Sequence, residues 1–143
     1  MAVTVGTSTL WASRDAKSIV LLAPATATNG APSGATNGLA TSELIFGAMP
    51  QSVGLQIYST AGSGTMSATC QLWGYKPNAT GTAKWHPIGQ PIVLAEISAD
   101  ALGYAKPLDM PGHFERLYCE VTAIGGTSTS ITAELDVRLG YPS

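Results

Sequence analysis

The sequence contains little charge. Seven lysines and arginines and nine aspartates and glutamates make up 11% of its 143 residues, whereas soluble domains usually carry about 25% charged residues. A soluble monomer normally covers its surface with charge. The scarcity therefore predicts either a surface coated in serine and threonine or a surface covered by other subunits. We favour the covered surface, because large exposed apolar patches are typical of interfaces.

Clusters of basic residues are also absent. Binding to phosphates requires lysine and arginine side chains gathered on one surface, and we therefore expect no nucleic-acid partner. The basic residues are scattered over the chain as Arg14, Lys17, Lys76, Lys84, Lys106, Arg116 and Arg138.

Long hydrophobic runs are missing as well. The longest purely aliphatic run, Ile19 to Ala23, is far shorter than the roughly 20 residues that cross a bilayer, so we expect no membrane partner. The first residues lack the basic start and the apolar stretch of a secretory signal. We therefore expect synthesis in a cytoplasm without export.

Only two cysteines occur, Cys70 and Cys119. Each falls on the apolar side of an alternating segment, where a free cysteine behaves as a small buried hydrophobe. A disulfide between them is the alternative, but a reducing cytoplasm disfavours it, and we predict free thiols. Their spacing with His86 and His113 matches no zinc motif, so we predict no metal site.

Motifs of catalysis are not found. The two histidines have no G-x-S-x-G nucleophile motif beside them, and no phosphate-binding glycine loop occurs. Glu134 and Asp136 share one strand face and formally suggest a carboxylate pair for glycoside hydrolysis. That face is the polar one, so we interpret it as a solvated surface. The sequence therefore predicts a protein that is not an enzyme, with no cofactor and no catalytic residue.

Alternating apolar and polar residues dominate the chain. From Phe114 to Leu139 the pattern predicts two strands around a turn at Gly125-Gly126-Thr127-Ser128, because period-2 alternation marks strands with one buried face. In the second strand the apolar face consists of Ile131, Ala133, Leu135, Val137 and Leu139. Further strands are predicted at Ser18–Ala23, Leu44–Ala48, Val53–Thr60, Ser67–Tyr75, Lys84–Ile88 and Ile92–Ser98, with a turn at Ala61–Gly64 and one helical turn at Ala99–Gly103.

This spacing of strands predicts an all-β fold. No window shows the 3.6-residue period of an amphipathic helix, and seven or eight short strands favour a single antiparallel β-sandwich of jelly-roll or Greek-key type. We place the sandwich in residues 17–143. Residues 1–16 form an N-terminal arm or edge strand, in which Val3, Val5, Leu10 and Trp11 are candidate interface residues.

A long loop rich in glycine, alanine, threonine and asparagine covers Ala25 to Ser42. It repeats Ala-Thr-Asn-Gly at 27–30 and 35–38, and Asn-Gly pairs favour turns. The loop is a flexible linker, a pair of surface turns, or a projecting loop that meets a partner. Long loops inside compact domains are usually functional or disordered. We favour a loop held by contacts, and take Asn29 and Asn37 as candidate interface residues.

Three aromatic residues are expected on one outward face. Trp73 and Tyr75 lie on the side opposite Cys70, and a hairpin through 76–83 brings Trp85 close to them. Such a cluster fits a subunit interface, a covered core or a sugar-stacking platform. Tyrosine and tryptophan are enriched at interfaces, and acids and amides that would bind sugar hydroxyls are scarce nearby. We favour the interface.

Two segments resemble small virion proteins of tailed bacteriophages. Cys70-Gln71-Leu72-Trp73-Gly74-Tyr75, followed by Trp85-His86-Pro87-Ile88-Gly89, is similar to a strand, a loop and a Trp-x-Pro-x-Gly pattern in those proteins. The segment 114–124, followed by a small-residue turn and an alternating strand, is similar too. The resemblance covers residues 66 to 140, about half the chain. It carries no catalytic residue.

The resemblance implies a capsid decoration, or cement, protein. Cement proteins of this kind are commonly trimers at the junctions between shell subunits, so the implied partners are copies of this chain and a major capsid or other virion protein. The implied location is the exterior of the capsid. The alternatives are a tail or head-fibre component, or a carbohydrate-binding module for host recognition that uses Trp73, Tyr75 and Trp85.

Overall fold

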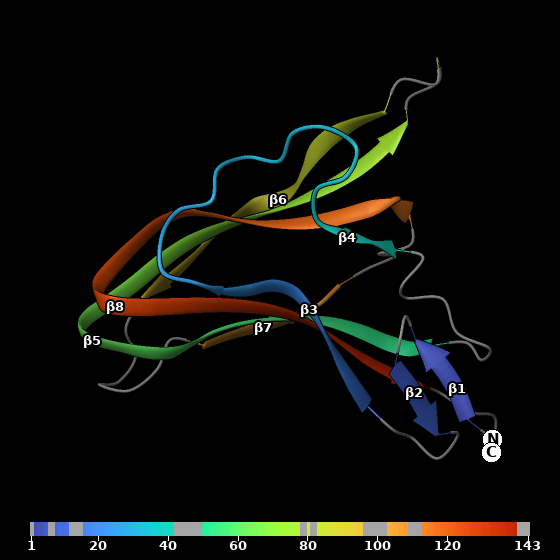
Figure 1. The fold of residues 1–143 in the computed structure, drawn as a ribbon, viewed down its shortest axis with the longest axis horizontal. Helices are drawn as coiled ribbons and strands as arrows, with labels where there is room; N and C mark the ends of the chain where they lie inside the picture. Colours follow the sequence, from blue (N-terminus) through green and yellow to red (C-terminus); the bar gives the residue numbers. More distant parts are fainter. Residues whose placement is uncertain are drawn as a thin grey trace.

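Two long strands organise the molecule. In the computed structural model β5 (Pro50–Pro77) and β8 (Arg116–Leu139) pair antiparallel along most of their length. On their outer sides β3 (Ala16–Ala25) and β4 (Leu39–Ala40) pair with β8, while β6 (Ala83–Ala95) and β7 (Gly103–Pro107) pair with β5 (Figure 1). The structure describes residues 2–5, 8–11, 16–41, 50–77, 80, 83–95, 103–108 and 113–139. Every pairing among them is antiparallel, which confirms the predicted all-β class.

The sheet is bent into two limbs. β5 and β8 fold over at the same level, where Ser63 pairs with Thr127 between register shifts. The first limb contains β3, the second half of β8, the first half of β5, and β7. The second limb contains β4, the first half of β8, the second half of β5, and β6. Figure 1 shows the limbs facing each other, joined at the bend on the left.

Glycine makes the bend tight. Gly126 has a φ of +95°, which suits a residue without a side chain. A Cβ atom there would lie 2.7 Å from Thr129 Oγ1 and 3.1 Å from the carbonyl oxygen of Ser63 on β5. Met66 is fully buried and fills the inside of the bend. Close packing between the two strands therefore leaves room only for a hydrogen at this position.

The bend corrects two predicted turns. Ala61–Gly64 and Gly125–Ser128 were expected to reverse the chain, but the strands continue through both segments and pair with each other. The predicted hairpin over 114–139 is therefore wrong, because its two halves lie on different limbs of one strand. Small residues permit a bend as readily as a reversal, and composition alone does not separate the two.

The core lies between the limbs. Alternate residues of β5 and β8 point inward, and the predicted apolar face of β8 is buried from Ile131 to Val137. Cys70 and Cys119 are buried on the second limb, as their parity predicted. The fully buried large side chains are Leu55, Ile57, Met66, Leu72, Leu117, Val121, Ile131, Leu135 and Val137.

A sandwich of two separate sheets is not confirmed, because hydrogen bonding continues from one limb to the other in one curled sheet. The segment predicted at 84–88 and the described part of the one predicted at 92–98 belong to a single strand, β6, which has a register shift between Ile88 and Ile92. The strand expected at 44–48 lies outside the described residues. So does the helical turn expected at 99–103, except for its last residue, Gly103, which begins β7. The described part of the chain holds no helix long and apolar enough to cross a membrane.

The N-terminal segment forms its own hairpin. β1 (Ala2–Val5) and β2 (Ser8–Trp11) pair antiparallel in a two-stranded sheet, with Val3 opposite Leu10. No register joins this hairpin to the six-stranded sheet among the residues described. The division into an arm and a domain remains a prediction.

Candidate binding surface on the second limb

Aromatic rings gather on the outer face of the second limb. Tyr75 on β5 pairs with Trp85 on β6, and their ring centroids are 5.0 Å apart. The predicted meeting of these two residues is therefore confirmed. Trp85 also contacts Tyr118 of β8 edge-on, at a centroid distance of 6.0 Å. Tyr118 was missed from the sequence, although it alternates with Cys119 and so had to face outward.

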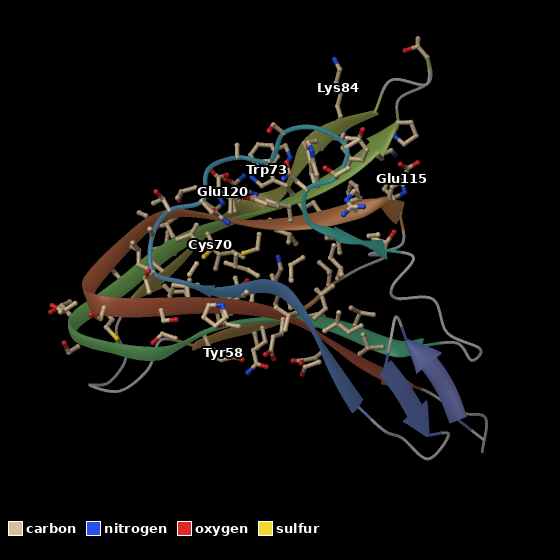
Figure 2. All side chains as sticks on the ribbon, viewed as in Figure 1. Tyr58, Cys70, Trp73, Lys84, Glu115 and Glu120 are labelled. Atoms are coloured by element: carbon tan, nitrogen blue, oxygen red, sulfur yellow. The ribbon has the colours of Figure 1, made fainter. Side chains whose placement is uncertain are left out.

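Trp73 lies beside this cluster and is fixed by an acid. Its indole Nε1 donates a hydrogen bond of 2.8 Å to Glu120 Oε2, and Figure 2 shows the two side chains together on the outer face. Trp73 pairs with Tyr118 across the β5–β8 ladder. The polar atom of Trp73 is therefore already used within the chain.

A segment of the long loop crosses this face. We call residues 26–38 the strap; Figure 1 shows it, blue to cyan, arching over the second limb between β3 and β4. Trp85 Nε1 donates to the carbonyl oxygen of Gly34 at 2.8 Å, and Tyr118 Oη donates to that of Gly30 at 3.0 Å. The side chains of Tyr75, Trp85 and Tyr118 are half-buried as a result.

Arg116 holds the end of the strap. Its Nε donates to the carbonyl oxygen of Asn37 at 2.6 Å, and its Nη2 donates to those of Gly38 at 2.7 Å and Thr36 at 3.1 Å. Hydrogen bonds from a charged donor are stronger than neutral ones. One guanidinium group therefore fixes three consecutive peptide units.

Asn29 fixes the start of the strap at the free edge of β8. Its Oδ1 accepts from the backbone N–H of Val121 at 2.7 Å, and its Nδ2 donates to the carbonyl oxygen of Cys119 at 3.0 Å. The side chain thus satisfies strand groups that a neighbouring strand would otherwise pair. At the other end Gly38 has a φ of +72°, and a Cβ atom there would overlap the backbone of Leu117.

The two Asn-Gly pairs of the repeat therefore anchor the two ends of the strap. This confirms a loop held by contacts. Asn29 and Asn37 both make bonds inside the chain, and the Oδ1 atom of Asn37 accepts from the backbone N–H of Ser33 at 2.8 Å. The strap lies against the sheet of its own chain, so it does not project from the molecule as one of the alternatives predicted.

The cysteines are free and buried behind this surface. A hydrogen bond with Cys70, together with burial, raises the pKa of the Cys119 thiol far above its usual range. Cys119 is therefore a protonated, packed side chain. In the part of the chain that the structure describes, no group of three or more histidine, cysteine, aspartate or glutamate side chains is placed to hold a metal ion.

The acids of the first limb are engaged with hydroxyl groups. Tyr58 Oη donates to Glu134 Oε1 at 2.5 Å, and Ser18 Oγ donates to Asp136 Oδ1 at 2.7 Å. The bond to Glu134 is the main cause that raises the pKa of Tyr58. The two carboxylates thus have separate partners, which suits a structural role.

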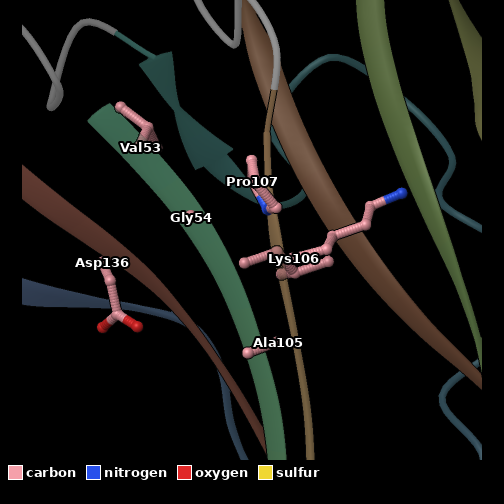
Figure 3. Close-up of a pocket in the computed structure, with 7 residues that line it drawn as sticks. Val53, Gly54, Ala105, Lys106, Pro107 and Asp136 are labelled. Carbon is pink, nitrogen blue, oxygen red and sulfur yellow. The ribbon is translucent and has the colours of Figure 1, made fainter. Parts of the chain in front are cut away.

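A hollow lies beside Asp136 on the outer face of this limb. Gly54 has no side chain there and leaves a depression of about 290 Å³ (Figure 3). Its other lining residues are Val53, Leu55, Ala105, Lys106 and Pro107. Figure 3 shows Lys106 pointing away from Asp136, so the hollow holds one acid and otherwise apolar groups.

The remaining candidates lie apart from this face. Val3, Val5, Leu10 and Trp11 belong to the N-terminal hairpin, and their side chains lie outside the described set. His113 stacks edge-on against Phe114 at 5.1 Å and contacts Lys76 Nζ through Nε2 at 2.8 Å. Whether any of the candidate residues meets a partner remains a prediction.

Comparison of the chain with family models, curated proteins and solved structures finds no match.

Proposed function

We propose that this protein is a structural subunit without enzymatic activity that decorates and stabilises a bacteriophage capsid as a homo-oligomer, with a trimer as the expected form. The observation that supports it best is that several of the few charged side chains on the outer faces of the sheet are already used in hydrogen bonds within the chain. They are Arg116, Glu120, Glu134 and Asp136.

Apolar groups at the sheet edges favour the same proposal. Val93 on β6 is 74% exposed and Val20 on β3 is 53% exposed. Both strands are outermost in the sheet order, and an outermost strand presents unpaired backbone groups to a partner. Lys84, at the end of the second limb, extends into solvent (Figure 2). Low charge, open edges and exposed valines fit a subunit that docks.

Decoration stabilises a shell through linkage. A subunit that binds the assembled shell and not its dissociated parts lowers the free energy of the assembled state. An oligomer bridges several shell proteins at once, so weak contacts add through effective concentration. In this proposal the arm at 1–16 and the outer side of the second limb, where the strap lies on the aromatic face, are the contact elements. The bent limbs of residues 17–143 act as the two leaves of one sandwich.

A carbohydrate-binding module has less support. The indole N–H groups of Trp73 and Trp85 already donate within the chain, and the strap crosses the face on which a sugar ring would stack. A tail or head-fibre subunit shares the charge argument with the decoration protein. The two roles differ in the structure that the subunit binds.

Binding to particles tests the proposal. Full-length protein and a variant lacking residues 1–14 are mixed with capsids and, separately, with tails of the phage that encodes the chain, and each mixture is sedimented. We expect full-length protein on capsids only, and a truncated protein that keeps its circular dichroism spectrum but does not bind. Binding to tails alone assigns the tail role instead. Undiminished capsid binding by the truncated protein contradicts the role of the arm.

A further inference from the structure

Apart from the side chain of Asn29, the strap is bound mainly through its backbone. Three side chains of the sheet, Trp85, Arg116 and Tyr118, donate five hydrogen bonds of 2.6–3.1 Å to carbonyl oxygens of the strap. The acceptors belong to Gly30, Gly34, Thr36, Asn37 and Gly38. Since every residue has a carbonyl group, these donors recognise a peptide backbone, which here bends at Gly30, Gly34 and Gly38, where φ is +72° to +74°.

The chemistry of the face matches that of known peptide grooves in general terms. Aromatic-lined grooves bind proline-containing extended segments, in which the peptide carbonyls find donors and the rings supply contact area. Here Tyr75, Trp85 and Tyr118 supply the rings. The strap contains Pro32 and otherwise only small uncharged residues, which allow its backbone to approach the rings closely.

We infer that the outer face of the second limb is a peptide-binding site that the strap occupies in cis, and that its ligand in trans is the strap of a second copy. The ligand class is an uncharged segment of alanine, serine, threonine, asparagine and proline that bends at glycines. Exchange of straps between copies replaces each contact by an identical one, so it costs little beyond the entropy of association. The identity of the donor copy rests on the proposed self-assembly, whereas the site itself does not.

Occupation in cis hides the site. A short tether gives the strap an effective concentration on the order of 1 mM at its own site. A free peptide must exceed that concentration before it competes. Removal of the strap should therefore uncover binding that the intact protein does not show at lower peptide concentrations.

The structure defines a strapless variant. Replacing residues 30–37 by Gly-Ser-Gly-Ser keeps Asn29 at the edge of β8 and Gly38 at the entrance to β4. Those anchors lie beside Val121 and Leu117, a separation of roughly 13 Å at about 3.3 Å per strand residue, which the linker spans. The matched control is the strapless protein with Trp85→Phe, Arg116→Lys and Tyr118→Phe, which keeps much of the surface but removes or misplaces its donors.

The experiment titrates an end-blocked peptide of residues 30–37, the segment that the strapless variant lacks, into each protein and follows tryptophan fluorescence and binding heat. We expect the strapless protein to bind at least about tenfold more tightly than the intact protein, and the control to lose that gain. A strapless protein that folds by circular dichroism but binds no better than the intact protein overturns the inference. So does binding of oligosaccharides in place of the peptide. If the strapless protein binds the peptide but the full-length protein is monomeric in native mass spectrometry, the result supports the peptide-binding site and contradicts the proposed self-assembly.

Discussion

Replacing Gly74 by alanine tests the packing of the second limb. Gly74 is buried in β5, and a Cβ atom there would overlap the ring of Phe114. That ring has little freedom to move away, because hydrogen bonds hold the backbone on which it stands. The carbonyl oxygen of Phe114 accepts from Thr41 Oγ1 at 2.6 Å, and the backbone N–H of Glu115 donates to the carbonyl oxygen of Tyr75 at 2.7 Å. The substitution therefore overpacks the site.

Overpacking of this kind costs about 1–3 kcal/mol of unfolding free energy. For a domain of this size about 4 °C of melting temperature corresponds to each kcal/mol, so we expect a decrease of roughly 4–12 °C. Thermal and urea unfolding followed by circular dichroism measure both quantities. The matched control is Gly54→Ala in the same strand, where a Cβ atom would lie 3.5 Å from the carbonyl oxygen of Lys106. That ordinary contact should change the unfolding free energy by about 0.5 kcal/mol or less.

A double-mutant cycle identifies the cause. Phe114→Ala alone removes a half-buried ring and destabilises the protein, but it also opens the space that a Cβ atom at Gly74 needs. The loss of unfolding free energy measured for the double variant should therefore be about 1–3 kcal/mol smaller than the sum of the losses in the two single variants. Additive losses, or equal effects of Gly54→Ala and Gly74→Ala, would refute the packing described for this limb.

Two further predictions each concern the hydrogen bonds of one side chain. Asn29→Ala removes the side-chain partners of the Val121 N–H and the Cys119 carbonyl, so urea unfolding should show a loss of about 1–3 kcal/mol of unfolding free energy. The control, Asn37→Ala in the other repeat, should lose about 0.5 kcal/mol or less. Equal losses would contradict the role of Asn29 at the edge of β8. The bond from Tyr58 to Glu134 raises the pKa of the Tyr58 hydroxyl. The stabilising effect of this bond is complete below the unfolded pKa of about 10 and is lost as the pH rises through the folded pKa. The unfolding free energy of Tyr58→Phe should therefore depend less on pH above about pH 10 than that of the wild type. An unchanged pH dependence would argue against the bond.

Burial was predictable from the sequence where one face of a strand is apolar. Ile131 to Val137 alternate cleanly, and the structure buries the apolar set. The course of the chain at Gly62 and Gly126 was not predictable in the same way. Whether such a segment reverses or bends depends on the strand beside it, and here the two glycine-rich segments bend together because β5 and β8 are paired there.

The binding surface was predictable in part. The cross-strand meeting of Tyr75 and Trp85 follows from a hairpin between their strands, and alternation alone places Tyr118 on the same side. The path of the strap does not follow from any pattern, because most of its contacts use backbone carbonyl oxygens, which all residues have. The hydrogen-bond donors of the sheet, above all Arg116, are the features that make this face a binding surface. A single arginine in a strand does not reveal from the sequence which carbonyl groups it will bind.

Native mass spectrometry of the full-length protein at micromolar concentration tests the central claim most directly. Because the described outer faces use much of their scarce charge internally and expose valines at two strand edges, we predict one homo-oligomer, of trimer mass. A stable monomer under the same conditions would contradict the claim that this surface is covered by other subunits.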